Sequence, residues 1–270
     1  MGKNTFVPVV ALCLAAALVI ALLPVAAQAQ PGGRGGGQRG GQGQRANMAA
    51  MMYLEFTWAA VNFGCEATDE QIANLKPVYQ DVYKRRAAVR AEAMQSRNFQ
   101  AIQQNIDETN KELGAALLKE LTEEQIAGLT EWQEGLTKLG EMVMAQQGQQ
   151  GPQNRGRMGA IMYLERTWSA INFGLELTAE QMATLRPIFA DAFKTRADAV
   201  AAGNADLLSA VLDDTRAHVE AKLKETLTEE QMAKYTELTS FGRPGGRGPG
   251  GGPGGQGGPG GGPGGPPPPQ

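Results

Sequence analysis

Apolar side chains recur every three or four positions through most of the chain between residues 50 and 240, the spacing of amphipathic α-helices. The two longest such stretches follow Thr68 and Thr178 and predict helices of roughly 30 and 24 residues. Shorter stretches predict one helix before each of them, at 51–63 and 162–173, and two helices after it. No stretch alternates apolar and polar residues with the period of a strand. The predicted fold class is therefore all-α.

This helical pattern occurs twice. The 20 residues at 52–71 return 110 positions later, at 162–181, with 14 of them identical. Each occurrence begins a unit of four predicted helices, in which the long helix and the next one form a helical hairpin. The first unit is four residues longer at the hairpin tip, about one helical turn. We interpret the chain as two tandem copies of a four-helix unit.

Each unit contains two Thr-x-x-Gln sequences, and each of these predicts the start of a helix. Threonine at the N-cap accepts a hydrogen bond from the first turn, and glutamine three residues later reaches back to the backbone N–H of the threonine. In three of the four cases leucine precedes the threonine and an apolar residue follows the glutamine, which is typical of a hydrophobic staple. The predicted capping pairs are Thr68 with Gln71, Thr122 with Gln125, Thr178 with Gln181 and Thr228 with Gln231.

Prolines and glycines refine the outline of the helices. Pro77 and Pro187 lie about nine residues into the two long helices, where the missing N–H and the ring predict a kink in each. Gly64 and Gly174 follow the preceding short helices, and we expect them to end these helices as C-caps.

The ends of the chain and one internal segment differ in composition from the helical units. Residues 1–29 combine Lys3, an apolar run and a small-residue cleavage site, which predicts a cleaved signal peptide; a retained membrane anchor is the alternative. Three further segments are rich in Gly, Pro, Arg and Gln and are predicted to be disordered or flexible. The predicted order is signal peptide 1–29, disordered Gly/Arg-rich segment 30–47, helical repeat 1 at 48–145, flexible linker 146–157, helical repeat 2 at 158–241 and disordered Gly/Pro-rich tail 242–270. The expected location is the periplasm or the exterior of the cell.

Charge is distributed unevenly between these segments. All 28 acidic residues lie in the helical units, whereas the flexible segments hold seven arginines and no acidic residue. Arg/Gly-rich tracts can bind nucleic acid, but export and the lack of interleaved aromatic residues argue against it. Contact with anionic envelope components through the Arg/Gly tails is one expectation, and an inert solubilising tail is the other.

The residue types needed for catalysis are scarce. The chain has one histidine, His218, so a Ser-His-Asp or Cys-His arrangement is not expected, and the protein is predicted not to be an enzyme. The exported chain would hold one cysteine, Cys65, which is interpreted as a small apolar residue with an intermolecular disulfide as the alternative. Three groups of methionines allow a Cu(I) site as an alternative, but no histidine or cysteine accompanies them. No cofactor and no metal site are predicted.

Basic side chains beside aromatic ones mark the candidate binding surface. Long basic side chains around exposed rings on a curved helix could hold a polypeptide loosely. In the competing interpretation the rings form a stripe of the hydrophobic core, and the basic side chains are its solvated edge. The candidate client-binding residues are Tyr79, Tyr83, Lys84, Arg85, Arg86 and Arg90 in the first unit and Phe189, Phe193, Lys194 and Arg196 in the second.

The two Thr-x-x-Gln sequences per unit carry a family resemblance. Leu177 to Gln181, Leu227 to Gln231, Leu121 to Gln125 and the imperfect Ala67 to Gln71 resemble the LTxxQ motif of periplasmic envelope stress proteins, the Spy/CpxP family. The resemblance covers most of both helical units. It implies an ATP-independent chaperone or stress-response protein built from long curved helices that pair as a dimer, and related members bind heavy metals. This chain departs from the family by its duplication, its two prolines and its Gly-rich tails, and its lack of histidine clusters fits the metal branch poorly.

The expected function follows from these features. We expect a non-enzymatic periplasmic chaperone-like or envelope stress-response protein whose partners are unfolded or partly folded proteins, or an envelope sensor protein. A structural or interaction module of the cell envelope and a periplasmic heavy-metal sensor are the alternatives. If relatives with one unit pair as dimers, the two units here could form an intramolecular pseudo-dimer, and two independent units on a flexible linker are the alternative.

Overall fold

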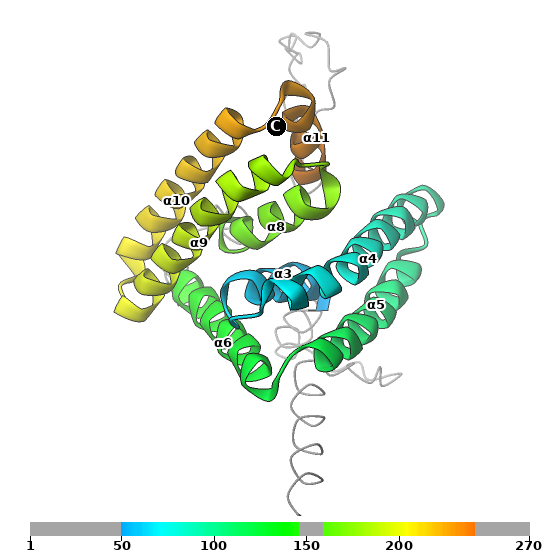
Figure 1. The fold of residues 1–270 in the computed structure, drawn as a ribbon, viewed down its shortest axis with the longest axis horizontal. Coiled ribbons are helices and arrows are strands. Elements are labelled where there is room, and N and C mark those ends of the chain that lie inside the picture. The colour runs from blue at the N-terminus through cyan, green and yellow to red at the C-terminus, as the bar shows by residue number, and fades with distance from the viewer. Residues whose placement is uncertain (1–49, 146–158, 241–270) are drawn as a thin grey trace, which may run out of the picture.

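The computed structural model describes residues 50–145 and 159–240, and all regular elements within them are helices, so the all-α prediction is confirmed (Figure 1). The predictions for residues 1–29, 30–47, 146–157 and 242–270 lie outside the described residues. The helices of the first half are α3 (Tyr53–Phe63), α4 (Asp69–Ser96), α5 (Phe99–Glu120) and α6 (Glu123–Ala145). Those of the second half are α8 (Tyr163–Ser169), the π-helical η3 (Ala170–Gly174), α9 (Ala179–Ala202), α10 (Ala205–Thr226) and α11 (Glu229–Ser240).

The four predicted capping boxes are present. In each one the threonine Oγ1 accepts from the glutamine backbone N–H at 3.2 Å, and the glutamine Oε1 accepts from the threonine N–H at 2.9–3.0 Å. These caps begin α4, α6, α9 and α11 at the expected places. The sequence signal for helix starts was therefore reliable, because capping depends on residues close together in the chain.

The two prolines lie inside helices, whereas the two glycines lie where helices pack closely. Pro77 and Pro187 lie inside α4 and α9, which continue as α-helix on both sides of them. Gly64 is the C-cap of α3, as predicted, and its backbone angles there are right-handed. Its missing side chain has another cause, since an added Cβ would lie 2.3 Å from Trp132 Cε3. A Cβ added at Gly174 would lie 2.3 Å from Leu238 Cδ1, so both glycines permit close helix packing.

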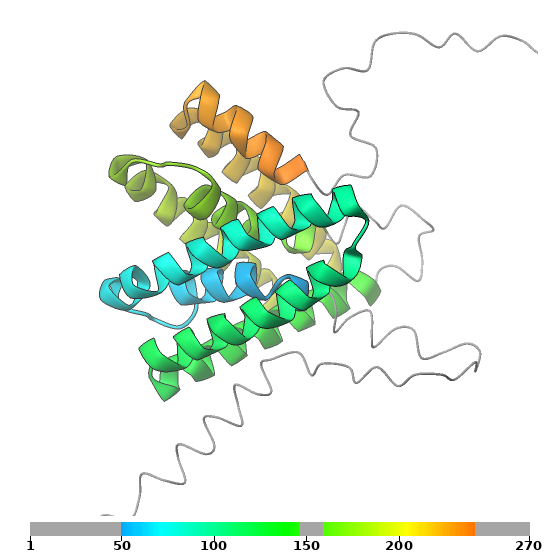
Figure 2. The ribbon, with the colours of Figure 1, turned by 90° about the vertical axis from the view of Figure 1, so that its right-hand side faces the viewer.

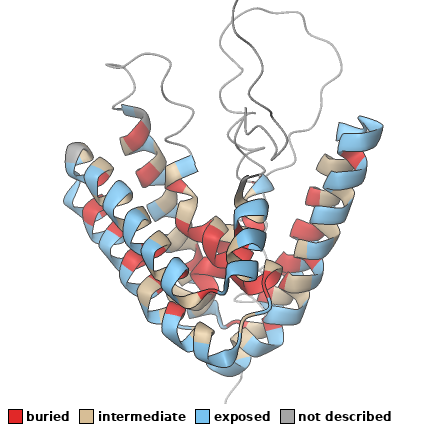
Figure 3. Cartoon of the chain, turned by 90° about the horizontal axis from the view of Figure 1, so that it is seen from above, coloured by how far each residue is buried: buried red, intermediate tan, exposed pale blue. Residues whose placement is uncertain are grey.

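The two halves share a core. α3 packs against α8 at the centre of the molecule, with the α4–α5 hairpin on one side and the α9–α10 hairpin on the other (Figures 1 and 2). The ring of Trp58 lies 4.9 Å from that of Phe173, and the ring of Phe63 lies 4.9 Å from that of Trp168. These are reciprocal contacts, because Trp168 and Phe173 occupy in the second half the positions of Trp58 and Phe63. Figure 3 shows the buried residues gathered where the halves meet.

Helix α6 also connects the two halves. Its C-terminal half leaves the first half and packs on the α9–α10 hairpin, where Leu139 and Val143 form a second core cluster with Ile161, Val200 and Leu208. The equivalent helix α11 has 12 residues, compared with 23 in α6. The two halves are thus held together asymmetrically, by a central symmetric contact and by one long helix that crosses between them.

Candidate functional site: a cleft between the halves

The aromatic residues of the predicted client surface lie in the core. Tyr79 and Phe189 are completely buried, Phe193 is almost so, and Tyr83 is half-buried against Phe173. The Tyr79 hydroxyl donates to Thr57 Oγ1 at 2.9 Å, and burial raises the pKa of Tyr79 well above its usual value. The expectation that these rings stand on a surface is corrected, because the shared core of the two halves covers the helix face on which they lie.

Most of the predicted basic residues have structural partners. Arg85 binds Asp81 and Glu112, and Lys194 binds Asp198. Arg86 donates to Thr109 Oγ1 and Asn110 Oδ1, and Arg196 donates to both carboxylate oxygens of Glu165. Lys84, Arg90 and Lys194 are exposed, and Arg90 also makes an interaction. Of these cations, Lys194 lies beside the buried ring of Phe193 in the cleft described below, and the Arg196 guanidinium lies 5.2 Å from the centre of that ring.

One glutamate and one arginine that are equivalent in the two repeats have different partners in the two halves. Glu165 and Arg196 form a buried ion pair in the second half. Their counterparts Glu55 and Arg86 do not, because Arg86 turns to Asn110, whose place in the second half is taken by Arg216. Glu55 Oε2 is covered by protein atoms and has no hydrogen-bond partner among the described residues, and burial raises the pKa of this carboxyl.

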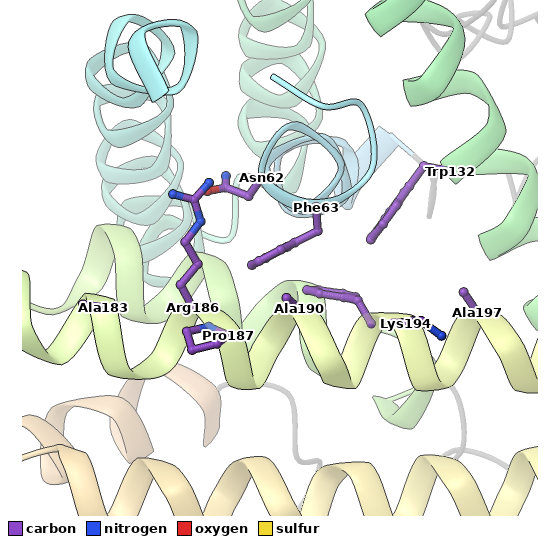
Figure 4. A pocket seen from close by; sticks show the side chains of 10 residues that line it. Asn62, Phe63, Trp132, Ala183, Arg186, Pro187, Ala190, Lys194 and Ala197 are labelled. Atoms are coloured by element: carbon purple, nitrogen blue, oxygen red, sulfur yellow. The ribbon is translucent and has the colours of Figure 1, made fainter. Parts of the chain in front are cut away.

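A cleft of about 670 Å³ lies between α3, α6 and α9 (Figure 4). Its apolar wall consists of Phe63 from α3, Trp132 from α6 and Phe193 from α9, and the Trp132 and Phe193 rings meet edge to face at 5.2 Å. Pro187 and three alanines of α9 also line the cleft, on the side that faces Phe63 and Trp132 (Figure 4). Each of the three helices contributes to the cleft only because the two halves are packed together.

The rim of the cleft is basic. Arg186 and Lys194 project from α9 along its edge (Figure 4). Arg186 binds the exposed Asp69 of the first half at 3.2 Å, and Lys194 binds Asp198 at 2.6 Å; both pairs are exposed to solvent. Exposed pairs of this kind contribute only about 0–1 kcal/mol, so an incoming carboxylate can compete for either cation.

Sequence reasoning did not single out Phe63, Trp132 or Arg186. A partial signal existed for Trp132, because the equivalent position of the second repeat is Leu238, so this is one of the places where the repeats differ. No periodicity within one helix could show that α6 crosses to the other half. Of the predicted residues, Phe193 and Lys194 line the cleft.

Metal-binding side chains do not cluster in the part of the chain that the structure describes. No three His, Cys, Asp or Glu side chains come together there as metal ligands. Cys65 is 4% exposed, and burial raises the pKa of its thiol to about 11, so it is protonated at neutral pH. Among residues 50–145 and 159–240, no helix has the length and apolar character needed to cross a membrane.

Comparison with known proteins gives no relative for this chain: no protein-family model, no curated protein and no solved structure matches it.

Proposed function

We propose that this protein is a non-enzymatic, chaperone-like protein of the cell envelope that binds partly folded polypeptides, and that the cleft between its halves is the client site. The observation that carries the proposal is an aromatic cleft with two basic side chains on its rim. A volume of about 670 Å³ is within the usual range for binding sites. It has room for one or two large apolar side chains of a client, and Arg186 and Lys194 suit an acidic residue next to them.

The Thr-x-x-Gln resemblance and the predicted signal peptide support the envelope location in this proposal. Fractionation of cells that express the tagged protein should find it outside the cytoplasm, with the mature chain beginning near Gln30. A protein retained in the cytoplasm with its first residues intact would contradict this part of the proposal.

The proposed client site is tested by filling the cleft. Ala190 is exposed and lines the cleft, so Ala190→Trp should occupy the space with little effect on folding. Ala210→Trp is the matched control, since Ala210 is an exposed helical alanine on α10 that does not line the cleft. The measurement is the aggregation of a denatured client protein without ATP, together with the Tm of each variant.

The native protein and Ala210→Trp should slow aggregation, and Ala190→Trp should do so several-fold less at an unchanged Tm. Equal protection by both variants would show that the cleft is not the client site. No protection by the native protein at several-fold molar excess would remove the chaperone function and favour a structural or interaction module of the envelope.

A further inference from the structure

A second, smaller cavity of about 200 Å³ lies between the halves and is lined by residues of both. Its floor contains Trp58 and Trp168, which are equivalent positions of the two repeats, and these residues are 1% and 0% exposed. Asn62 and Asn172, also equivalent, line it one helical turn further on. Each asparagine Nδ2 donates to the backbone carbonyl of the tryptophan in its own half at 2.8 Å, which fixes both side chains in the same way.

The upper part of the cavity repeats this symmetry. Ile72 faces it from α4 and Met182 from α9, and they are equivalent residues. Lys76 and Arg186 are equivalent as well, and they bring one positive charge from each half. Lys76 and Ala183 are exposed, so the mouth of the cavity lies on this side. The wall is thus apolar in the middle and cationic at two positions that are equivalent in the two repeats.

An exposed ion pair compensates one of these two charges. Arg186 has one exposed acidic partner, Asp69, on the opposite half. The equivalent partner for Lys76 would be residue 179, which is Ala179, so the reciprocal ion pair is missing. Two cations beside a low-polarity cavity create a positive potential that favours an anion inside.

From this geometry we infer that the cavity binds a small dicarboxylate. Its apolar middle lies between Trp58 and Trp168, and its two carboxylates face Lys76 and Arg186. The volume equals that of about six or seven water molecules at about 30 Å³ each, which admits a short linear acid and excludes a folded chain. The cavity adjoins the proposed client cleft, with which it shares Asn62, Ala183 and Arg186, and the inference does not depend on the proposed function.

The test uses tryptophan fluorescence with the whole exported chain. The protein has three tryptophans, so Trp132→Phe leaves Trp58 and Trp168 as reporters inside the cavity. Succinate, glutarate and adipate are titrated into this variant, and calorimetry repeats the titration with the native protein. Butyrate, which has one carboxylate, and the neutral diamide of glutarate are the ligand controls.

Two sets of substitutions locate the site. Lys76→Gln and Arg186→Gln each remove one of the paired charges, and Lys84→Gln is the matched control, an exposed lysine on α4 that does not line the cavity. Asp69→Ala removes the acidic partner of Arg186 and copies the alanine that the second repeat has at this position. The melting temperature of each variant shows that it is folded.

One of the three dicarboxylates should bind with a change in fluorescence and should bind more tightly than butyrate or the diamide. Lys76→Gln and Arg186→Gln should each weaken it about tenfold, Asp69→Ala should tighten it, and Lys84→Gln should leave it unchanged. The absence of binding up to about 10 mM would overturn the inference. So would binding that the two glutamine variants do not weaken, because the ligand would then occupy another place.

Discussion

Gln71 and Gln125 bind each other through their side-chain amides, each Nε2 donating to the Oε1 of the other at 2.9 Å. Each Nε2 also donates to a backbone carbonyl next to the opposite capping box, that of Glu120 for Gln71 and that of Glu66 for Gln125. Both glutamines accept at the same time from the N–H of their own capping threonine. The start of α4 and the start of α6 are therefore tied into one hydrogen-bonded unit.

The second half repeats the arrangement with Gln181 and Gln231. This explains why each repeat contains two Thr-x-x-Gln sequences. A capping box alone tolerates glutamate in place of glutamine, but glutamate could not supply the Nε2 donor that joins the two boxes. The motif thus ties the starts of two helices together in each unit.

The first prediction tests the amide pair. Gln125→Glu keeps the cap acceptor but removes the donor to Gln71 Oε1 and to the Glu66 carbonyl, and it places a charge against an acceptor. It should lower the free energy of unfolding by about 1–3 kcal/mol in urea denaturation. Gln100→Glu, the same change at an exposed position of α5, should have an effect within about 0.5 kcal/mol. Equal effects at the two positions would show that the pair adds nothing.

The second prediction concerns a single cap. Thr228→Ala removes the Oγ1 that accepts from the Gln231 N–H at the start of α11. The free energy of unfolding should fall by roughly 1 kcal/mol, because a helix N–H loses its acceptor. Thr228→Ser retains the hydroxyl and should recover most of the loss. If serine and alanine gave the same stability, the hydroxyl would not be the stabilising group.

These two sites also show how far the sequence could predict the structure. The caps at Thr68 and Thr228 were predictable because each involves residues three positions apart. The pairing of Gln71 with Gln125 was not, because it joins residues 54 positions apart through the fold of the unit. The same limit explains why Tyr79 was wrongly expected on the surface. The helical spacing of apolar residues shows that Tyr79 shares a face of α4 with Val82, but it does not show that the other half covers this face.

The candidate site was predicted only in part for a related reason. The sequence marked Phe193 and Lys194, which do line the cleft, as part of a stripe along α9. The remaining wall comes from α3 and α6, and its position depends on Trp132 packing over Gly64. Contacts between distant helices of this kind leave no periodic signal in either helix.

The third prediction is a pH dependence that Glu55 causes. Burial raises the pKa of Glu55 in the folded protein above the unfolded value of 4.5. The folded state then holds a proton that the unfolded state releases, so this group makes stability fall as pH rises above about 4.5. Glu55→Gln should stabilise the protein at pH 7 by about 1 kcal/mol and have little effect below pH 4. Urea denaturation between pH 4 and 8 measures this, and a loss of stability at pH 7 would contradict it.

The fourth prediction is that the equivalent glutamate behaves in the opposite way. Glu165 is completely buried and binds the Arg196 guanidinium through both oxygens, at 3.0 and 2.5 Å. Glu165→Gln leaves a buried guanidinium without its counter-charge and should cost about 3–5 kcal/mol. Thermal and urea denaturation at pH 7 should therefore show a higher stability for Glu55→Gln and a lower stability for Glu165→Gln than for the native protein. If both variants changed the free energy of unfolding in the same direction, the different partners of Arg86 and Arg196 would not explain how each glutamate affects stability.

The last prediction concerns the first half on its own. The central contact pairs Trp58 with Phe173 and Phe63 with Trp168, and the second-half residues have the same types at equivalent positions. Residues 46–145 alone therefore carry both members of the reciprocal contact, a Trp58 and a Phe63, and two such chains can meet as the two halves do here.

On its own, this half would expose Trp58 and Phe63. It would also expose Leu139 at the C-terminal part of α6, which packs against the second half in the full chain. Burial of such side chains contributes about 1.5–3 kcal/mol each, so the isolated half should form a dimer in light scattering or melt well below the full chain, whereas the full chain should be a compact monomer. Trp58→Ala in the isolated half should shift it toward the monomer. A first half that stays monomeric with an unchanged Tm would show that the contact between α3 and α8 adds no stability and that the halves fold independently.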